Sequence, residues 1–138
     1  MKLRIKGNSI RLRLGQSEVR RLAIDGIVEE STAFGPSRDE CFGYSLYASS
    51  ESHEVSAKFA DRRLVVRVPT SVVHQWASTD QVGIDALQHT GSDEGLRILI
   101  EKDFECIDAP SGESQEDAFP NPQLEAACQP AGGSERST

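Results

Sequence analysis

The sequence contains no long apolar run and few cysteines. None of its apolar segments approaches the roughly 20 residues that cross a bilayer, so we expect no membrane contact. The N-terminal stretch MKLRIKGNSIRLRL alternates charged and aliphatic residues, and therefore lacks the continuous apolar core of a signal peptide. Three widely spaced cysteines, Cys41, Cys106 and Cys128, do not make a disulfide framework. Together these absences predict a cytoplasmic protein with reduced thiols.

Motifs that carry chemistry are absent as well. The histidines His53, His74 and His89 and the cysteines have no spacing typical of a zinc site, and there is no P-loop, dinucleotide fingerprint or G-x-S-x-G motif. Cys106 lies near Glu105 and Asp108, whose charges oppose a thiolate, so a packed apolar role is favoured for it. The sequence therefore predicts no metal, no cofactor and no enzymatic activity.

The low apolar fraction of 37% indicates that part of the chain of 138 residues is not packed. From residue 108 onward proline, glycine, serine and acids dominate, and Phe119 is the single aromatic residue. Such a composition buries too little apolar area to offset the entropy lost on ordering. We predict one domain over residues 1–123, in which Phe119 anchors the last segment, and a disordered acidic and polar tail over residues 124–138.

Hydrophobic periodicity predicts strands and two short helices. Apolar residues at every second position predict strands that are lined on one face by Leu3/Ile5, Ile10/Leu12/Leu14, Phe42/Tyr44/Leu46/Ala48, Val55/Ala57/Phe59, Leu64/Val66/Val68, Val82/Ile84/Ala86 and Leu96/Ile98/Ile100. The phase changes at Gly7-Asn8-Ser9, which predicts a tight turn or a bulge. The stripe Val19, Leu22 and Ala23 predicts a helix that begins at Gln16 or Ser17 and ends at Asp25-Gly26.

Two segments share one outline of strand, short helix and strand, residues 10–32 and residues 64–86. When the two are aligned, the helical stripe 19/22/23 of the first reappears in the second as Val73, Trp76 and Ala77. Two explanations stay open, an internal duplication and the general similarity of any amphipathic strand–helix–strand unit. The sequence thus predicts an α+β fold: mostly antiparallel sheet or a partly closed barrel with two short helices, and a pseudo-two-fold arrangement if the repeat is a duplication.

Two resemblances rest on specific stretches. The ends KLRIKGNSIRLRL and DAFPNP, with VEESTAFG and EKDFECID between them, resemble a family of small uncharacterised bacterial proteins. That resemblance implies that Phe119 to Pro122 belong to the ordered part, and it implies no chemistry. The stretch RVPTSVVHQWASTDQVGIDA is similar to the swapped-hairpin units of AbrB-like regulators and MazE-like antitoxins. This second resemblance implies dimerisation and DNA contact by basic residues. The chain departs from that pattern at Thr79, where a glycine is expected, and in having no Lys or Arg over residues 72–77.

Charge is distributed unevenly along the chain. Residues 101–138 account for the whole net charge of −7, whereas residues 1–21 hold cations against Glu18 alone. Glu29 and Glu30 follow the first helix in a strand. If the sheet closes, the inward one can form an ion pair with Arg11, Arg13 or Arg67. The candidate binding residues form an N-terminal basic face: Lys2, Arg4, Lys6, Arg11, Arg13, Arg20 and Arg21.

These observations favour a non-enzymatic protein-interaction module whose basic face binds a second copy, as in a homodimer, or an acidic protein partner. The alternative is a DNA-binding transcriptional regulator of swapped-hairpin type. A row of cations suits phosphate contacts, but the chain is acidic overall and no aromatic platform interleaves with the basic residues. A third reading, an enzyme, needs a pocket that gathers Glu30, Arg13 and His74.

Overall fold

The computed structural model describes residues 1–104 and 117–120. In chain order its elements are β1 (Lys2–Lys6), β2 (Ser9–Leu14), α1 (Gln16–Asp25), β3 (Ile27–Ala33), a 3-10 turn η1 (Arg38–Glu40), β4 (Cys41–Ser49), β5 (Ser56–Ala60), β6 (Arg63–Pro69), α2 (Thr70–Ser78), β7 (Gly83–Gln88) and β8 (Leu96–Lys102). The predictions made for Cys106, Cys128 and the tail 124–138 fall outside the described residues. No helix in the described part of the chain has the length and apolar character to span a membrane.

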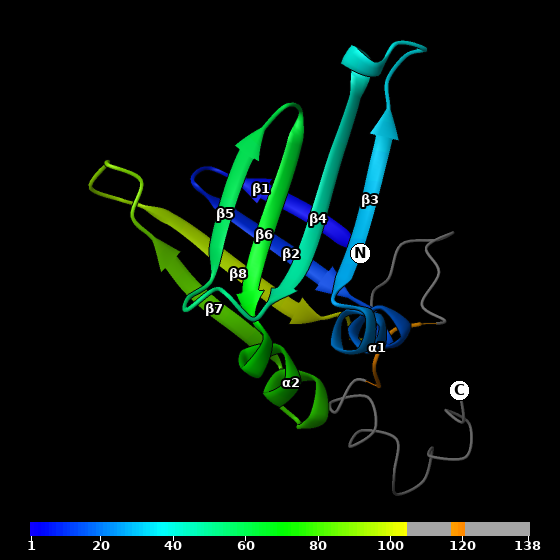
Figure 1. The fold of residues 1–138 in the computed structure, drawn as a ribbon, viewed down its shortest axis with the longest axis vertical. Coiled ribbons are helices and arrows are strands. Elements are labelled where there is room, and N and C mark those ends of the chain that lie inside the picture. Colours follow the sequence, from blue (N-terminus) through cyan, green and yellow to red (C-terminus); the bar gives the residue numbers. More distant parts are fainter. Residues whose placement is uncertain (105–116, 121–138) are drawn as a thin grey trace, which may run out of the picture.

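The strands form two four-stranded sheets, ordered β1-β2-β8-β7 (sheet A) and β3-β4-β6-β5 (sheet B). The central pair of each sheet, β2–β8 or β4–β6, is parallel, and the outer pairs are antiparallel. The strands of sheet B cross in front of those of sheet A, and α1 and α2 lie together at one end of both sheets (Figure 1).

The two halves of the chain have the same element order and nearly the same pairing. Lys2 pairs with Arg13 in the first hairpin, and Ser56 pairs with Arg67 at the equivalent positions of the second. The parallel pairs correspond in the same way, Ser9 with Arg97 and Arg63 with Gly43. Both parallel pairs join one half to the other. Each sheet is therefore built from a hairpin of one half and a hairpin of the other.

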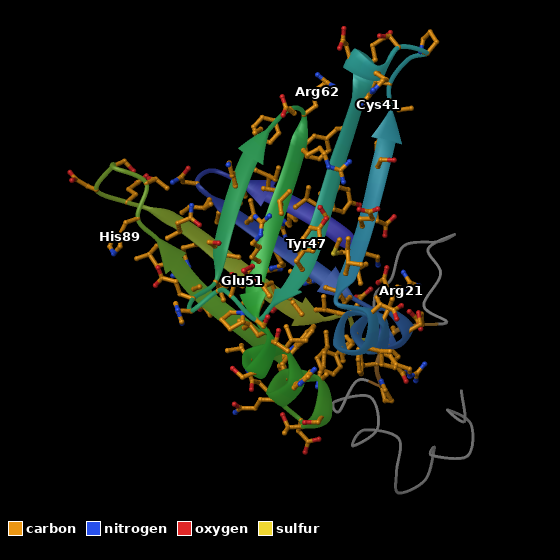
Figure 2. The ribbon with its side chains drawn as sticks, viewed as in Figure 1. Arg21, Cys41, Tyr47, Glu51, Arg62 and His89 are labelled. Atoms are coloured by element: carbon orange, nitrogen blue, oxygen red, sulfur yellow. The ribbon has the colours of Figure 1, made fainter. Side chains whose placement is uncertain are left out.

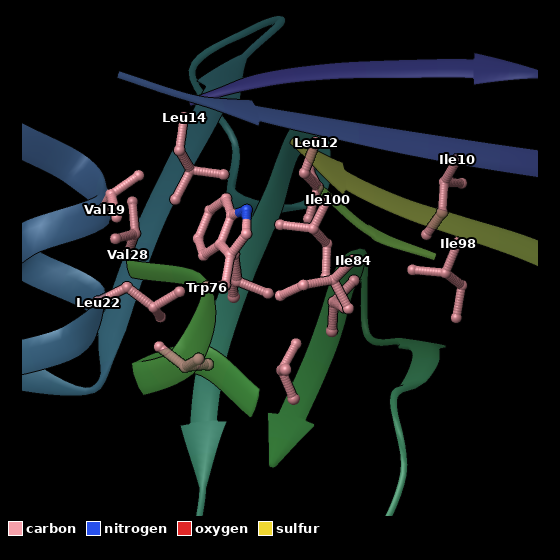
Figure 3. Close-up of a cluster of buried hydrophobic side chains, with 14 of the residues drawn as sticks. Ile10, Leu12, Leu14, Val19, Leu22, Val28, Trp76, Ile84, Ile98 and Ile100 are labelled. Carbon is pink, nitrogen blue, oxygen red and sulfur yellow. The ribbon is translucent and has the colours of Figure 1, made fainter. Parts of the chain in front are cut away.

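The core lies between the sheets and under the helices. α1 contributes Val19 and Leu22, and α2 contributes Val73 and Trp76, all buried. Trp76 is fully buried among the aliphatic side chains of both sheets (Figure 3), and its indole Nε1 donates to the carbonyl of Val82 at 3.0 Å. Gly26 ends α1 with φ +82°, a left-handed conformation that suits glycine. The predicted stripes and the end of α1 are confirmed.

The α+β class with two short helices is confirmed, but the sheets do not close into a barrel. At two seams, an edge strand of one sheet faces an edge strand of the other. Contacts that involve side chains, rather than a ladder of backbone hydrogen bonds, join the two strands at each seam. At the β5/β7 seam the Gln88 carboxamide accepts from the Ala57 N–H (2.6 Å) and donates to the Ala57 carbonyl (2.9 Å). At the other seam the Met1 ammonium, beside β1, contacts Glu30 of β3. Parallel pairing in each sheet also makes both sheets mixed.

Candidate binding face

The hairpin β1–β2 places five of the seven predicted cations on one face of sheet A. Gly7, with φ +54°, and Asn8 form the two-residue turn between the paired residues Lys6 and Ser9. Alternation then points Ile10 and Leu12 into the core. The opposite side of both strands carries Lys2, Arg4, Lys6, Arg11 and Arg13. We call these five residues the sheet A cations.

The sheet A cations lie directly opposite one another across the hairpin. Lys2 pairs with Arg13 and Arg4 pairs with Arg11. Cβ atoms of such pairs are about 5 Å apart, and like charges in this position destabilise a sheet. Anions that approach the face would reduce this repulsion.

Two carboxylates of the described residues reach this face. Glu101 of β8 lies 3.4 Å from the Nε atoms of both Arg11 and Arg13, and Asp103 lies 3.2 Å from Lys2 Nζ. These partly exposed ion pairs contribute about 1 kcal/mol or less each. They neutralise the end of the hairpin that is nearer to the helices. Neither carboxylate was included in the predicted face, because β8 is remote from β1 and β2 in the sequence.

The other end of the hairpin has no such neutralisation. Within residues 1–104 and 117–120, no carboxylate lies within ion-pair distance of Arg4 or Lys6. A hollow of about 190 Å³ opens there, lined by Arg4, Lys6, Ser9 and Arg11. The Ser9 hydroxyl donates to the Lys6 carbonyl at 2.7 Å, so the donors that remain for a ligand are guanidinium and ammonium groups.

Arg20 and Arg21 lie outside the hairpin that carries the sheet A cations. Both are on α1, and Figure 2 shows Arg21 beside that helix. Arg21 lines a hollow of about 320 Å³ together with Lys2, Arg13 and the acids Glu18, Asp103 and Asp117. Arg20 lines a different, largely apolar groove of about 430 Å³ between α1 and α2, with His74 on its other side. Arg21 therefore adjoins the helix end of the sheet A cations, whereas Arg20 lies apart from them.

A returning segment of the chain caps α1. The Asp117 carboxylate accepts from the Ser17 N–H (3.0 Å) and from the Ser17 hydroxyl (2.7 Å), and the Asp117 carbonyl accepts from the Gln16 N–H (2.8 Å). The contact requires Gly15, since a Cβ there would lie 2.2 Å from the carboxylate. A negative charge at a helix N-terminus also interacts favourably with the helix dipole.

Phe119, predicted to anchor this segment, packs against Phe104 with ring centroids 5.8 Å apart. Its N–H donates to the Asp103 carbonyl at 2.7 Å. Lys102 lies under the same ring, 5.5 Å from its centroid. The prediction for Phe119 is therefore confirmed, whereas nothing local in the sequence indicated that Asp117 caps α1.

Lys102 is a buried cation, 7% exposed. Its Nζ donates to the Thr79 carbonyl at the end of α2 (2.7 Å) and lies 6.0 Å from the centre of the Trp76 ring. Burial lowers the pKa of Lys102, and the charge of Asp80 partly opposes that effect. The side chain holds the C-terminal end of α2 against sheet A.

The N-terminal ammonium of Met1 is enclosed by Glu18 and Glu30. Burial disfavours its charge, but hydrogen bonds and attraction from both carboxylates outweigh this, so the pKa of the ammonium is raised above 8.0. Tyr44 donates to the Met1 carbonyl at 3.1 Å. Burial, with the negative charges of Glu30 and Glu18, raises the pKa of Tyr44.

The sheets do not close, and the ion pair expected for a closed sheet does not form. Glu30 meets the Met1 ammonium, and Glu29 lies 3.5 Å from Arg63. The enzyme reading also finds no shared site, because Arg13 pairs with Glu101 and His74 lies 3.3 Å from the Ala23 carbonyl. Glu30, Arg13 and His74 therefore take part in three separate contacts.

Candidate metal ligands are dispersed. His89 follows β7 and Cys41 starts β4, far apart in Figure 2, and His74 is on α2. In the described ranges, no three His, Cys, Asp or Glu side chains are placed to hold a metal ion.

Comparison with known proteins gives a family without an assigned activity. The profile of a family described as "Family of unknown function (DUF7009)" matches residues 1–123, and the chain belongs to this family. No curated protein and no solved structure matches the chain.

Proposed function

We propose that this member of the DUF7009 family is a non-enzymatic interaction module that binds an acidic protein partner through the sheet A cations. The supporting observation is the difference between two equivalent hairpins. At the positions of Lys2, Lys6 and Arg11 the second hairpin has Ser56, Ala60 and Val65. Since the same pairing forms there without those charges, the cations of the first hairpin serve something other than the fold.

The test compares matched triple variants of the full chain. Arg4→Gln/Arg11→Gln/Arg13→Gln removes charge from sheet A, and Lys58→Gln/Arg63→Gln/Arg67→Gln removes the same charge from the second hairpin. The probe is a short fluorescent poly-glutamate peptide, followed by anisotropy at 50 mM and 300 mM salt. We expect the sheet A variant to bind at least tenfold more weakly than the wild type, and the control variant to bind within about twofold of it.

Binding should weaken at the higher salt concentration, because exposed charges are screened beyond about 8–10 Å at physiological salt. Equal loss in both variants would indicate a non-specific charge effect and contradict the proposal. So would a failure of the wild type to bind at 50 mM salt.

Self-association is the second form of the same proposal. The acidic residues 101–138 of one copy offer charge complementary to the sheet A cations of another. Sedimentation of the wild type at 50 mM salt should show a dimer in cytoplasm-like reducing buffer, and the sheet A variant should remain monomeric. If the wild type is monomeric at all salt concentrations, self-association is contradicted. Binding of a different acidic partner is then tested by the poly-glutamate assay alone.

The second candidate is a DNA-binding regulator of swapped-hairpin type from a bacterium. The exchange of hairpins between the two halves favours it, because the resemblance to AbrB-like and MazE-like units implies such an exchange. Against it, Glu101 and Asp103 interrupt the cations that would follow a phosphate backbone. A short mixed-sequence DNA duplex, added to the same assay, decides: tighter binding than poly-glutamate would favour this candidate.

A further inference from the structure

The hollow at the turn end of the first hairpin has the chemistry of an oxyanion site. Arg4, Lys6 and Arg11 bring three cations to a space of about 190 Å³, and no carboxylate of the described residues lines it. Arg11 and Arg4 are cross-strand partners, so their guanidinium groups start from adjacent backbone positions. One anion between them would reduce their repulsion and accept hydrogen bonds from both.

The convergence of three cations favours a dianion over a single carboxylate. A phosphomonoester carries a charge near −2 at pH 7 and three acceptor oxygens. Arginine matches such a group with a planar fork of donors, and lysine adds a compact charge. Arg11 meets Glu101 through Nε, which leaves its terminal nitrogens for a ligand.

The distribution of charge favours a discrete site over a track. A nucleic-acid backbone needs cations along its length. Here the cations towards the helices, Arg13 and Lys2, already meet Glu101 and Asp103. The two sheet A cations without a carboxylate partner among the described residues, Arg4 and Lys6, both line the one hollow.

We propose that the hollow of Arg4, Lys6 and Arg11 binds one phosphomonoester dianion, carried by a phosphorylated serine or threonine of a protein partner. This inference rests on the proposed function, in that it names the chemical group by which the acidic partner is recognised. The remaining sheet A cations then contact unmodified acidic residues around that group.

The experiment titrates the ¹⁵N-labelled full chain at pH 7.5 and constant ionic strength. The probes are inorganic phosphate and three versions of one pentapeptide, acetyl-Ala-Ala-X-Ala-Ala-amide with phosphoserine, glutamate or serine at X. We expect saturable shifts of the amide signals of residues 4–11 with the phosphoserine peptide, at least tenfold tighter than with the glutamate peptide. Arg4→Gln should weaken binding of the phosphoserine peptide at least tenfold.

Lys58→Gln is the matched control, since Lys58 occupies the position of Arg4 in the second hairpin. It should leave the affinity within about twofold of the wild type, and Lys6→Gln serves as a second variant of the hollow. Lowering the pH to 5 should weaken binding several-fold, because the second pKa of the phosphate is about 6 and the ligand becomes a monoanion.

Each contrary outcome has its own meaning. Equal binding of the glutamate and phosphoserine peptides overturns this inference while the proposed function stands. If inorganic phosphate binds as tightly as the phosphoserine peptide, the hollow is a site for a free anion. That result overturns the proposal that the phosphate group is carried by a protein partner. Failure of both peptides here, together with failure of poly-glutamate in the earlier assay, overturns the inference and the proposed function together.

Discussion

The two halves of this chain fold alike and differ in charge. At the seven positions predicted as a basic face, the second half keeps positive charge at Lys58 and Arg67, and has neutral residues or His74 elsewhere. The contacts differ too: Arg13 meets the Glu101 carboxylate, whereas the equivalent Arg67 lies over the ring of Tyr47, 5.6 Å from its centre. One scaffold thus carries an ionic surface on sheet A and a more neutral surface on sheet B. We therefore look for the function of the protein on the charged surface of sheet A.

The core gives the largest expected difference between the halves. Trp76 is equivalent to Leu22, and both are fully buried. Trp76→Leu copies the first half into the second, removes the donor of the Val82 carbonyl and leaves a cavity beside Lys102. We expect the free energy of unfolding to fall by about 2–4 kcal/mol. Urea unfolding followed by far-ultraviolet circular dichroism measures it.

A loss below about 1 kcal/mol would mean that the second half repacks around leucine as the first half does. Leu22→Met provides the control, since a swap of similar volume in the first half should cost less than about 1.5 kcal/mol.

Helix capping is the next difference. α1 receives its cap from Asp117, whereas α2 has Pro69 at its N-cap position and no side-chain cap among the described residues. Asp117→Ala should lower the free energy of unfolding by about 1 kcal/mol, the usual cost of losing a cap. Thermal unfolding measures it, with Asp85→Ala on exposed β7 as the control. An unchanged melting temperature would show that the Asp117 side chain adds nothing to the contacts made by Phe119 and by the backbone of the segment.

The seams of the two halves should respond differently to pH. The Met1 ammonium has a raised pKa, so its contribution is complete below about pH 8 and is lost as the pH rises through the folded-state value. The lowered pKa of Lys102 changes the free energy of unfolding with pH in the opposite direction. The informative quantity is therefore the difference in that free energy between wild type and Glu30→Gln. We expect that difference, about 1 kcal/mol or less at pH 7, to shrink by pH 9.5.

The β5/β7 seam provides the reference. Gln88→Ala removes two hydrogen bonds made by a neutral amide, so its cost should be the same at pH 7 and pH 9.5. Denaturant titrations at both values decide, and a pH-independent effect of Glu30→Gln would contradict the ionic role of the first seam.

The smallest expected effect has the opposite sign. Arg4→Gln removes one of two like charges that lie opposite each other. Unfolding should therefore become more costly by about 0.2–0.5 kcal/mol, while Lys58→Gln, opposite Val65, changes stability less. Urea titrations in low-salt buffer without phosphate can resolve this. A loss of stability in Arg4→Gln would mean that Arg4 has a structural role.

Local features of the fold were predictable and distant pairings were not. The turn at Gly7-Asn8, the stripe Val19/Leu22 and the end of α1 at Gly26 depend on residues a few positions apart, where backbone preferences and periodicity are decisive. The parallel pairs β2–β8 and β4–β6 depend on which strands meet, and alternation in a strand does not encode its neighbour. Of the two predicted alternatives, an open sheet rather than a partly closed barrel forms, and both sheets are mixed.

The candidate face shows the same limit. Alternation correctly placed Arg4 and Arg11 on one side of their strands. Glu101 arrives beside them only through the pairing of β8 with β2, and the separation of Arg20 from that side follows from how α1 packs against α2. No pattern within the N-terminal basic stretch contains either fact.

The interleaved sheets also govern how the chain folds. β8, the last strand of the described residues, lies in the interior of sheet A between β2 and β7. Ser9 of β2 therefore has no parallel partner until Arg97 of β8 has been synthesised. During synthesis the first hairpin therefore leaves the ribosome long before β8, the strand that pairs with β2. Contacts this distant in sequence slow folding. Neither half has a complete sheet of its own, so we expect the domain to form only after residues 96–102 have emerged.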